Sequence, residues 1–222
     1  MQKLATGLHK FHAEVCRTHQ DLFRSLARGQ RPEALFITCA DSRINPNLIT
    51  QTEPGDIFIV RNVGNIVPPY GASNGSEAAA IEFAVAHLEV KHIIVCGHTL
   101  CGAMRGLLDP GSLEALPGVK SWLQHAELTR RLVQENYPHI EGEDRLTITV
   151  EENVLAQIEN LRTHPTVRAR LARGELSLYA WVFKIETGQV FQFDASSGQY
   201  TPICDTASPS ALPETAVFRR AC

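Results

Sequence analysis

Two short polar clusters hold the side chains in this sequence that are best suited to bind a metal ion. The first reads CADSR and begins at Cys39, and the second reads HTLCG and begins at His98. Together they offer two thiols, an imidazole and a carboxylate, which are ligands that zinc accepts in a tetrahedral arrangement. His98 and Cys101 are close enough in sequence to bind one ion from a single turn, and Cys39 and Asp41 point to one side of an extended chain. We therefore predict a zinc site with Cys39, His98 and Cys101 as ligands and with water or Asp41 in the fourth position.

Asp41 and Arg43 stand beside the first predicted ligand. A carboxylate next to a metal can accept the proton of a metal-bound hydroxide, and a guanidinium can hold that carboxylate through a charge-assisted, bidentate hydrogen bond. Without Arg43, Asp41 would be free to bind zinc. We therefore predict that this pair orients the hydroxide and acts as a gate, in which Asp41 becomes a zinc ligand when the pair opens. A structural ion pair or a helix cap is the alternative interpretation.

Alternating strand and helix signals must bring the two clusters together. The clusters end apolar runs over residues 34–38 and 92–96. Amphipathic spacing predicts helices over residues 76–90 and 154–161. Runs of β-branched and aromatic residues predict strands over residues 35–39, 57–60, 93–96, 146–150, 178–185 and 190–193. This alternation is typical of an α/β fold with a mainly parallel central sheet flanked by helices, in which ligands collect at the carboxyl ends of the strands.

The two ends of the chain differ from this alternating middle. Apolar residues at spacings of three or four predict an N-terminal helical arm over residues 1–28, made of one long or two short helices. A turn at residues 186–189 predicts a hairpin, and hence a late antiparallel edge strand. The last part of the chain is rich in proline, serine, threonine and alanine, which predicts a flexible tail over residues 201–222. We expect a single domain over residues 1–200.

Composition limits the classes of protein that fit this sequence. A chain of 222 residues that is 44% hydrophobic can bury a full core. The formal net charge of −3 gives no electrostatic reason to expect nucleic acid or an acidic membrane surface as a partner. No uninterrupted apolar segment approaches the roughly 18 residues that span a bilayer. The chain opens without the apolar stretch of a signal peptide, so we expect a soluble, cytoplasmic protein with reduced cysteines.

Three motifs together resemble those of the β-class carbonic anhydrases. They are CxDSR from Cys39, RNxGN from Arg61 and GHxxCG from Gly97, and they occur in the order and spacing of that family. The resemblance covers most of the chain. The opening LxxGLxxF from Leu4 and the segment EGED from Glu141 are also similar to the cyanobacterial carboxysomal members of the plant-type branch.

The resemblance implies a pocket for the substrate. Gln30 matches the pocket glutamine of the plant-type branch, and Phe58 and Val63 match its apolar wall. Phe83 stands where that branch often has tyrosine, so a hydrogen bond from the tyrosine hydroxyl would be absent and bicarbonate binding would differ. By this resemblance and by donor chemistry, Gln30 and the backbone N–H of Gly102 are candidates to hold bicarbonate oxygens. Phe58, Val63 and Phe83 are candidates to hold carbon dioxide.

The reaction implied is the zinc-dependent, reversible hydration of carbon dioxide to bicarbonate and a proton, with zinc-bound hydroxide as the nucleophile. Zinc lowers the pKa of its bound water toward about 7, but two thiolate ligands oppose this, so groups around the ligands must compensate. Two other functions remain open. The same site could hydrolyse carbon disulfide or carbonyl sulfide, or the chain could be a structural zinc scaffold adaptor with Asp41 permanently on the metal. The presence of Arg43 argues against the adaptor, because a structural ligand needs no releasing partner.

The resemblance also implies partners beyond carbon dioxide and bicarbonate. It implies a homo-oligomer built from dimers, in which the N-terminal arm packs on a partner subunit. If the carboxysomal likeness holds, we expect the protein inside carboxysomes, with a carboxysomal scaffold protein as a partner.

Overall fold

The computed structural model describes residues 1–73, 75–203 and 209–214, and the chain divides into two compact units, Met1–Arg31 and Pro32–Cys222. The first unit is helical, as expected. It contains α1 (Gln2–Lys10), the π-helical turn η1 (Phe11–Val15), α2 (Cys16–Thr18) and α3 (Gln20–Leu26). The helical path is interrupted at His19, where φ is −112° and ψ is 26°. The unit therefore holds two helical stretches, which is one of the two forms that the sequence predicts.

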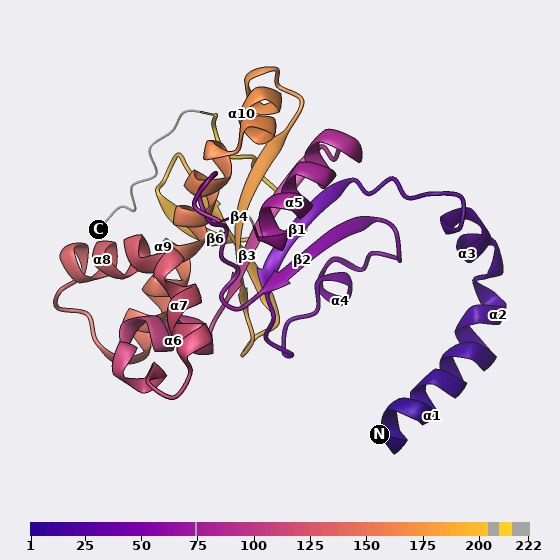
Figure 1. Ribbon diagram of the computed structural model, residues 1–222, viewed down its shortest axis with the longest axis horizontal. Coiled ribbons are helices and arrows are strands. Elements are labelled where there is room, and N and C mark those ends of the chain that lie inside the picture. The colour runs from indigo at the N-terminus through magenta and orange to yellow at the C-terminus, as the bar shows by residue number, and fades with distance from the viewer. Residues whose placement is uncertain (74, 204–208, 215–222) are drawn as a thin grey trace. The chain divides into compact units, whose positions relative to one another are not determined.

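The second unit is built on a six-stranded sheet in the order β2-β1-β3-β4-β5-β6 (Figure 1). The strands are β1 (Ala34–Cys39), β2 (Ile57–Asn62), β3 (His92–His98), β4 (Ser177–Lys184), β5 (Gln189–Asp194) and β6 (Gln199–Pro202). Strands β2, β1, β3 and β4 pair in parallel, and β5 and β6 are antiparallel. The predicted α/β class and late antiparallel hairpin are confirmed, and β6 adds a strand that the sequence did not predict.

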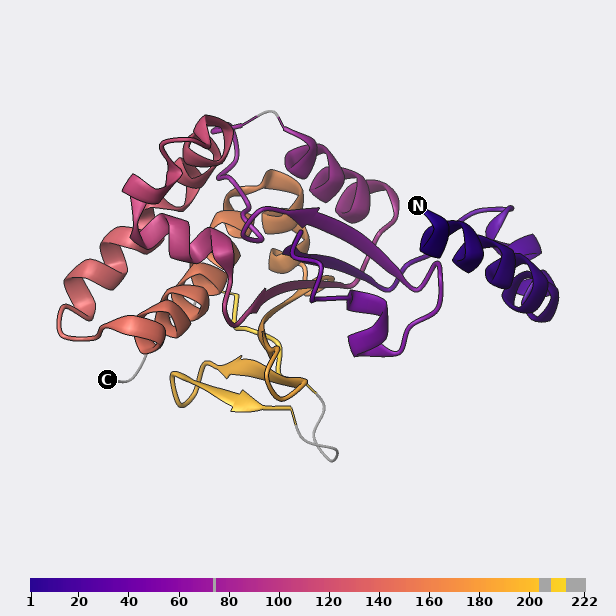
Figure 2. The same ribbon diagram turned by 90° about the horizontal axis from the view of Figure 1, so that it is seen from below.

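Helices cover both faces of the sheet, which suits a parallel sheet with apolar residues on both sides. The helices of this unit are α4 (Pro46–Thr50), α5 (Ser76–Glu82) with its π-helical end η2 (Phe83–His87), α6 (Gly102–Leu108), η3 (Pro110–Leu113), α7 (Pro117–Leu123), η4 (Gln124–Ala126), α8 (Glu127–Asn136), α9 (Gly142–Thr163) and α10 (Pro165–Ala172). Figure 2 shows α5 and α10 on one side of the sheet and α4 on the other. The described residues include no helix that is both long enough and apolar enough to cross a membrane.

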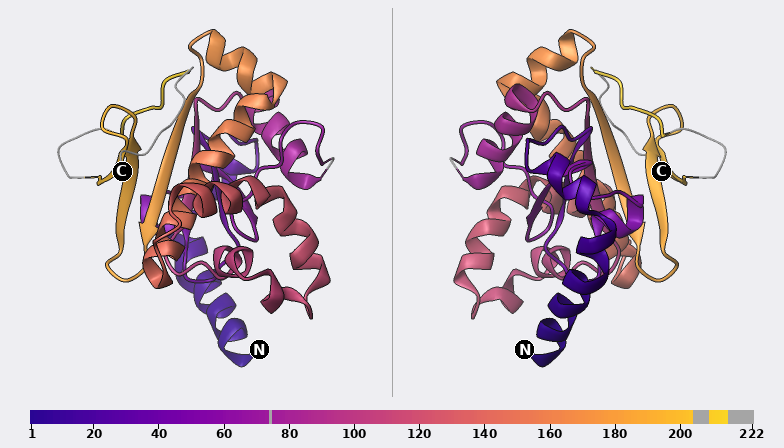
Figure 3. Two further views of the ribbon diagram at one scale, coloured as in Figure 1. Left: turned by 90° about the vertical axis from the view of Figure 1, so that its left-hand side faces the viewer. Right: turned by 90° about the vertical axis from the view of Figure 1, so that its right-hand side faces the viewer.

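The larger core lies on the side of α5, α9 and α10, seen with the sheet nearly edge-on in Figure 3. There, Leu35 and Ile37 of β1 share one buried cluster with Ile81 of α5 and Val154 of α9. The alternate β1 residue, Phe36, packs on the opposite face in a smaller cluster that includes Ile44 and Ile94. Because alternate residues of one strand enter two cores, β1 is buried along its whole length.

The predicted strand over residues 146–150 is wrong, because these residues belong to α9. The alternating Leu-Thr-Ile-Thr-Val favours a strand locally, but tertiary packing overrides that preference. Leu146, Val150 and Val154 follow one another at helical spacing and are all buried on the sheet side. Thr147 and Thr149 are accommodated because each hydroxyl donates to a carbonyl four residues earlier.

The structure describes two parts of the predicted tail, residues 201–203 and 209–214. Strand β6 extends to Pro202, and the N–H of Leu212 donates to the carbonyl of Leu178 at 2.8 Å. Leu212 is also buried in the main core. Leu212 therefore contacts the sheet through both its backbone and its side chain. Residues 204–208 and 215–222 of the predicted tail lie outside the described residues.

A substitution at Gly97, next to the predicted ligand His98, tests the packing of α9 on the sheet. A Cβ added there would lie 2.7 Å from Cγ2 of Val154 and 3.0 Å from Cγ1 of Val150, both stiff side chains in the core. We expect Gly97→Ala to lower the free energy of unfolding by about 1–3 kcal/mol through overpacking, measured by urea denaturation. Gly118→Ala on α7, where a Cβ meets nothing within 4 Å, is the control and should retain or slightly raise stability. Equal stability of Gly97→Ala and the unaltered protein would contradict the packing described here.

Candidate metal centre

The sheet brings the three predicted zinc ligands into one buried cluster. Cys39 is the last residue of β1 and His98 the last residue of β3, and these strands are parallel neighbours that end at the same edge. Cys101 follows three residues later as the N-cap of α6, after Leu100 turns the chain with a positive φ of 57°. The ligand atoms of Cys39, His98 and Cys101 all lie within 4.8 Å of one another.

The geometry of this cluster and the orientation of its imidazole fit zinc. The two Sγ atoms are 4.0 Å apart, and a tetrahedral ion with Zn–S bonds of about 2.3 Å would place its sulfurs about 3.8 Å apart. Nδ1 of His98 lies 2.9 Å from the carbonyl oxygen of Thr99, so it is the nitrogen that carries the proton. Nε2 of His98 is buried and has no hydrogen-bond partner among the described residues. A neutral imidazole with an unused lone pair is what a metal ligand requires.

The two thiols are not equivalent. The hydrogen bond with Cys101 is the main cause that lowers the pKa of Cys39 to about 4, and His98 and the backbone N–H of Gly64 contribute to this shift. The same hydrogen bond, together with burial, raises the pKa of Cys101. In the absence of a cation, the two sulfurs therefore share one proton. A bound cation would allow both sulfurs to ionise, because it replaces the shared proton.

Asp41 and Arg43 form a bidentate ion pair at the rim of the cluster. Oδ1 of Asp41 accepts from Nε of Arg43 at 2.9 Å and from its backbone N–H at 3.0 Å, and Oδ2 accepts from Nη2 at 2.7 Å. Nη2 also donates to the carbonyl of Leu100, in the turn between the two ligands of the second cluster. The guanidinium holds the pKa of Asp41 well below its usual range. Oδ2 nevertheless lies only 3.9 Å from Nε2 of His98.

The structure adds residues to the site that motif chemistry alone did not assign. Arg61 on the edge strand β2 donates to the carbonyls of Cys39, Asp41 and Ile44, and so fixes the first cluster from its backbone. The N–H of Gly64 donates to Sγ of Cys39 at 3.4 Å. Both residues belong to the RNxGN motif, so their presence was visible in the sequence but their contacts were not.

For the residues predicted to bind substrate, the structure shows how exposed they are and a few of their contacts. The rings of Phe58 and Phe83 are in contact, with centroids 6.0 Å apart, and Phe83 is 43% exposed. Val63 is also exposed, next to Gly64. Gly102 is the exposed first residue of α6, and a Cβ there would meet nothing within 4 Å, so its backbone is open to an approaching ligand. Gln30 belongs to the first unit and is exposed.

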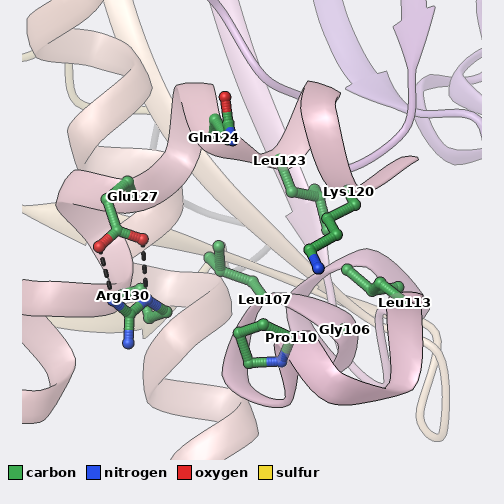
Figure 4. Close-up of a pocket in the computed structure, with 9 residues that line it drawn as sticks. All are labelled: Gly106, Leu107, Pro110, Leu113, Lys120, Leu123, Gln124, Glu127 and Arg130. Carbon is green, nitrogen blue, oxygen red and sulfur yellow. Dashed lines mark hydrogen bonds and ion pairs between the residues drawn. The ribbon is translucent and has the colours of Figure 1, made fainter. Parts of the chain in front are cut away.

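A separate cavity of about 300 Å³ lies between α6, η3, α7 and α8 (Figure 4). Its base is apolar, with Leu107, Leu113 and Leu123, and its rim carries charged side chains. The rim cation Arg130 is already paired with Glu127, as the dashed lines in Figure 4 show. None of the predicted site residues lines this cavity.

The fold and the cluster together define a class of protein: an α/β protein with a cysteine–histidine metal site at the carboxyl edge of a parallel sheet. The family model described as carbonic anhydrase matches residues 34–190. The chain is 55% identical over 195 residues to a carbonic anhydrase of Synechocystis sp., covering 87% of this chain and 71% of the relative. It is 50% identical over 214 residues to a carbonic anhydrase of Synechococcus elongatus, covering 96% and 78%.

Solved structures agree with these relatives. The β-carbonic anhydrase CcaA superimposes with a TM-score of 0.90 at 52% identity, and the match covers 93% of each chain. A β-carbonic anhydrase of Coccomyxa in complex with acetazolamide gives a TM-score of 0.77 at 32% identity, covering 90% of this chain and 86% of that one. The chain therefore belongs to the β-class carbonic anhydrases. It is an enzyme, and its reaction is the hydration of carbon dioxide to bicarbonate.

Proposed function

We propose that Cys39, His98 and Cys101 hold one catalytic zinc ion for this reaction. The observation that supports the proposal most strongly is the buried cluster itself, in which the ligand atoms of all three residues lie within 4.8 Å of one another. The ion would supply a Lewis acid that makes hydroxide available from water near neutral pH. The thiolates would hold the ion, and the Nδ1–H bond to the carbonyl of Thr99 keeps the imidazole in the tautomer that could bind it.

Asp41 and Arg43 are proposed to orient and gate the reacting oxygen. Oδ2 of Asp41 lies 3.9 Å from Nε2 of His98, so the carboxylate could accept a hydrogen bond from the reacting oxygen and orient it. Arg43 holds both carboxylate oxygens and thereby keeps Asp41 away from the fourth ligand position. When the pair opens, Asp41 would take that position and stop the reaction. A structural zinc adaptor would instead need Asp41 on the metal while Arg43 is paired elsewhere.

The pocket residues are proposed by their chemistry. Phe58, Val63 and Phe83 offer an apolar wall, which suits carbon dioxide because it has no net dipole to solvate. The backbone N–H of Gly102 at the start of α6 is a donor for an anionic oxygen of bicarbonate. Gln30 is proposed as a second donor to bicarbonate.

Assembly and location are proposed from relatives and from the first unit. Leu4, Leu8 and Phe11 are exposed there, and a related β-carbonic anhydrase of Sordaria macrospora, matched with a TM-score of 0.78 at 33% identity, is tetrameric. We propose a homo-oligomer built from dimers, which a solution mass equal to a single chain of 24.5 kDa would contradict.

From the likeness to cyanobacterial carbonic anhydrases we also propose a cytoplasmic protein inside carboxysomes that binds a scaffold protein. Failure to sediment with purified carboxysomes would contradict this location.

Replacement of one thiolate tests the metal centre. We expect Cys101→Ser to lose most of the bound zinc and to lower carbon dioxide hydration at least about 100-fold, because a hydroxyl is a poor ligand for this ion. Zinc content is measured by elemental analysis and hydration by stopped flow, with carbonyl sulfide and carbon disulfide as alternative substrates. The control is Cys96→Ala, which removes a buried thiol outside the cluster and should retain zinc and hydration. Full zinc and activity in Cys101→Ser would refute the site, and faster turnover of the sulfur substrates would favour the alternative hydrolase.

Release of Asp41 tests the gate. In the cobalt-substituted enzyme, Arg43→Gln should weaken the binding of azide by about tenfold or more, because the freed carboxylate competes for the fourth ligand position. Azide binding is followed through the visible spectrum of cobalt. The double variant Asp41→Asn with Arg43→Gln lacks the competing carboxylate and should bind azide as the unaltered enzyme does. Unchanged azide affinity in Arg43→Gln would show that Asp41 does not gate this site.

A further inference from the structure

Helix α9 carries three amides on the face that meets the loop after β2. Asn153, Gln157 and Asn160 are spaced four and three residues apart, so they share one helical face. Asn153 is 1% exposed and Gln157 is fully buried. Asn160 is partly buried. Buried amides in an apolar core are costly unless each is hydrogen-bonded.

Each amide is bonded to the loop or to its neighbour. Nδ2 of Asn153 donates to the carbonyl of Gly64 at 3.0 Å, 89 residues away in sequence. Gln157 accepts from the N–H of Val67 at 2.9 Å, and Asn160 donates to the carbonyl of Val67 at 2.8 Å. Nε2 of Gln157 also donates to Oδ1 of Asn153, which leaves the NH₂ group of Asn153 directed at Gly64.

The peptide group before Gly64 is held by a side chain from another helix. Nε1 of Trp122 on α7 donates to the carbonyl of Val63 at 2.8 Å. That carbonyl and the N–H of Gly64 belong to one peptide group, and this N–H is the donor to Sγ of Cys39. A donor on the carbonyl of a peptide group polarises it and strengthens the hydrogen bond that its N–H makes.

Gly64 itself has little freedom to move. Its φ is 84°, and a Cβ there would lie 3.0 Å from Cε of Met104 and 3.1 Å from Cβ of Ala103 on α6. The loop therefore passes between Cys39 and the helix that follows Cys101, with both adjoining peptide groups fixed by side chains from α7 and α9.

From these contacts we infer that Trp122 and Asn153 are positioning residues that act on the metal centre through Gly64. They keep the N–H of Gly64 on Sγ of Cys39, and this hydrogen bond withdraws charge from the sulfur. The inference rests on the proposed zinc site. It identifies the groups that offset the strong electron donation of two thiolate ligands, which otherwise makes the ion a weaker Lewis acid.

The test uses the cobalt-substituted protein, because the thiolate-to-cobalt charge-transfer band reports the electron density on sulfur. Trp122→Phe retains an aromatic ring but removes the N–H, and Asn153→Asp removes the donor to Gly64 with almost no change in shape. We expect the band of both variants to move to longer wavelength. We also expect zinc affinity, measured by competition with a chromogenic chelator, to fall about tenfold.

Asn160→Asp is the matched control, because it removes a bond of the same type from the same helix to Val67 of the same loop. Its band should stay where it is. An unchanged band and affinity in Trp122→Phe would overturn the inference, and so would an equal shift in Asn160→Asp, which would indicate general loosening of the loop. Trp122→Phe decides the matter if Asn153→Asp does not fold. A missing charge-transfer band in the unaltered protein would instead overturn the metal centre itself, and the inference with it.

Discussion

Two sulfur atoms 4.0 Å apart in a buried position are the constraint on which this structure depends. Neighbouring thiolates repel each other, and without a cation the pair reduces the repulsion by keeping one proton. The surroundings must then hold both cysteines and the imidazole in place whether or not a cation balances them. The parallel pairing of β1 with β3 does this, because it fixes the backbone of Cys39 and His98 at one sheet edge.

Many polar side chains lie near the three ligand atoms without contacting them. They instead form hydrogen bonds to the backbone of the two sequence clusters that carry the ligands. Arg61 donates to two carbonyls of the first cluster and to that of Ile44 directly after it, and Arg43 donates to the carbonyl of Leu100 in the second cluster. On the far side, Thr99 accepts from the N–H of Ile185 and donates to Glu186, which fixes the end of β3 to the end of β4. Each bond fixes a backbone segment that carries a ligand, so the ligands need little freedom of their own.

The parts of this arrangement that depend on local pattern could be predicted from the sequence. The apolar runs before Cys39 and His98 indicate strands, and parallel strands end at one edge, so the convergence of the ligands followed. The helix over residues 142–163 could not be predicted correctly throughout, because its Leu-Thr-Ile-Thr-Val stretch has the local signature of a strand and only burial against the sheet decides otherwise. Leu212 was missed for a similar reason, since one apolar residue among prolines gives no periodicity to read.

The contacts of Asn153 and Trp122 were beyond sequence reasoning for a different physical reason. Their side chains bind backbone carbonyls of Val63 and Gly64, and a backbone carbonyl has no side-chain signature. From the sequence alone, a polar asparagine in a helix is interpreted as solvent-exposed, because neither its burial nor its hydrogen-bond partner is visible there. The ligand types nevertheless predict that such hydrogen-bond donors are present, because two thiolates donate much charge to a metal ion and a donor to sulfur reduces that charge. The need was predictable from the ligands, whereas the residues that meet it depend on how α7 and α9 pack around one loop.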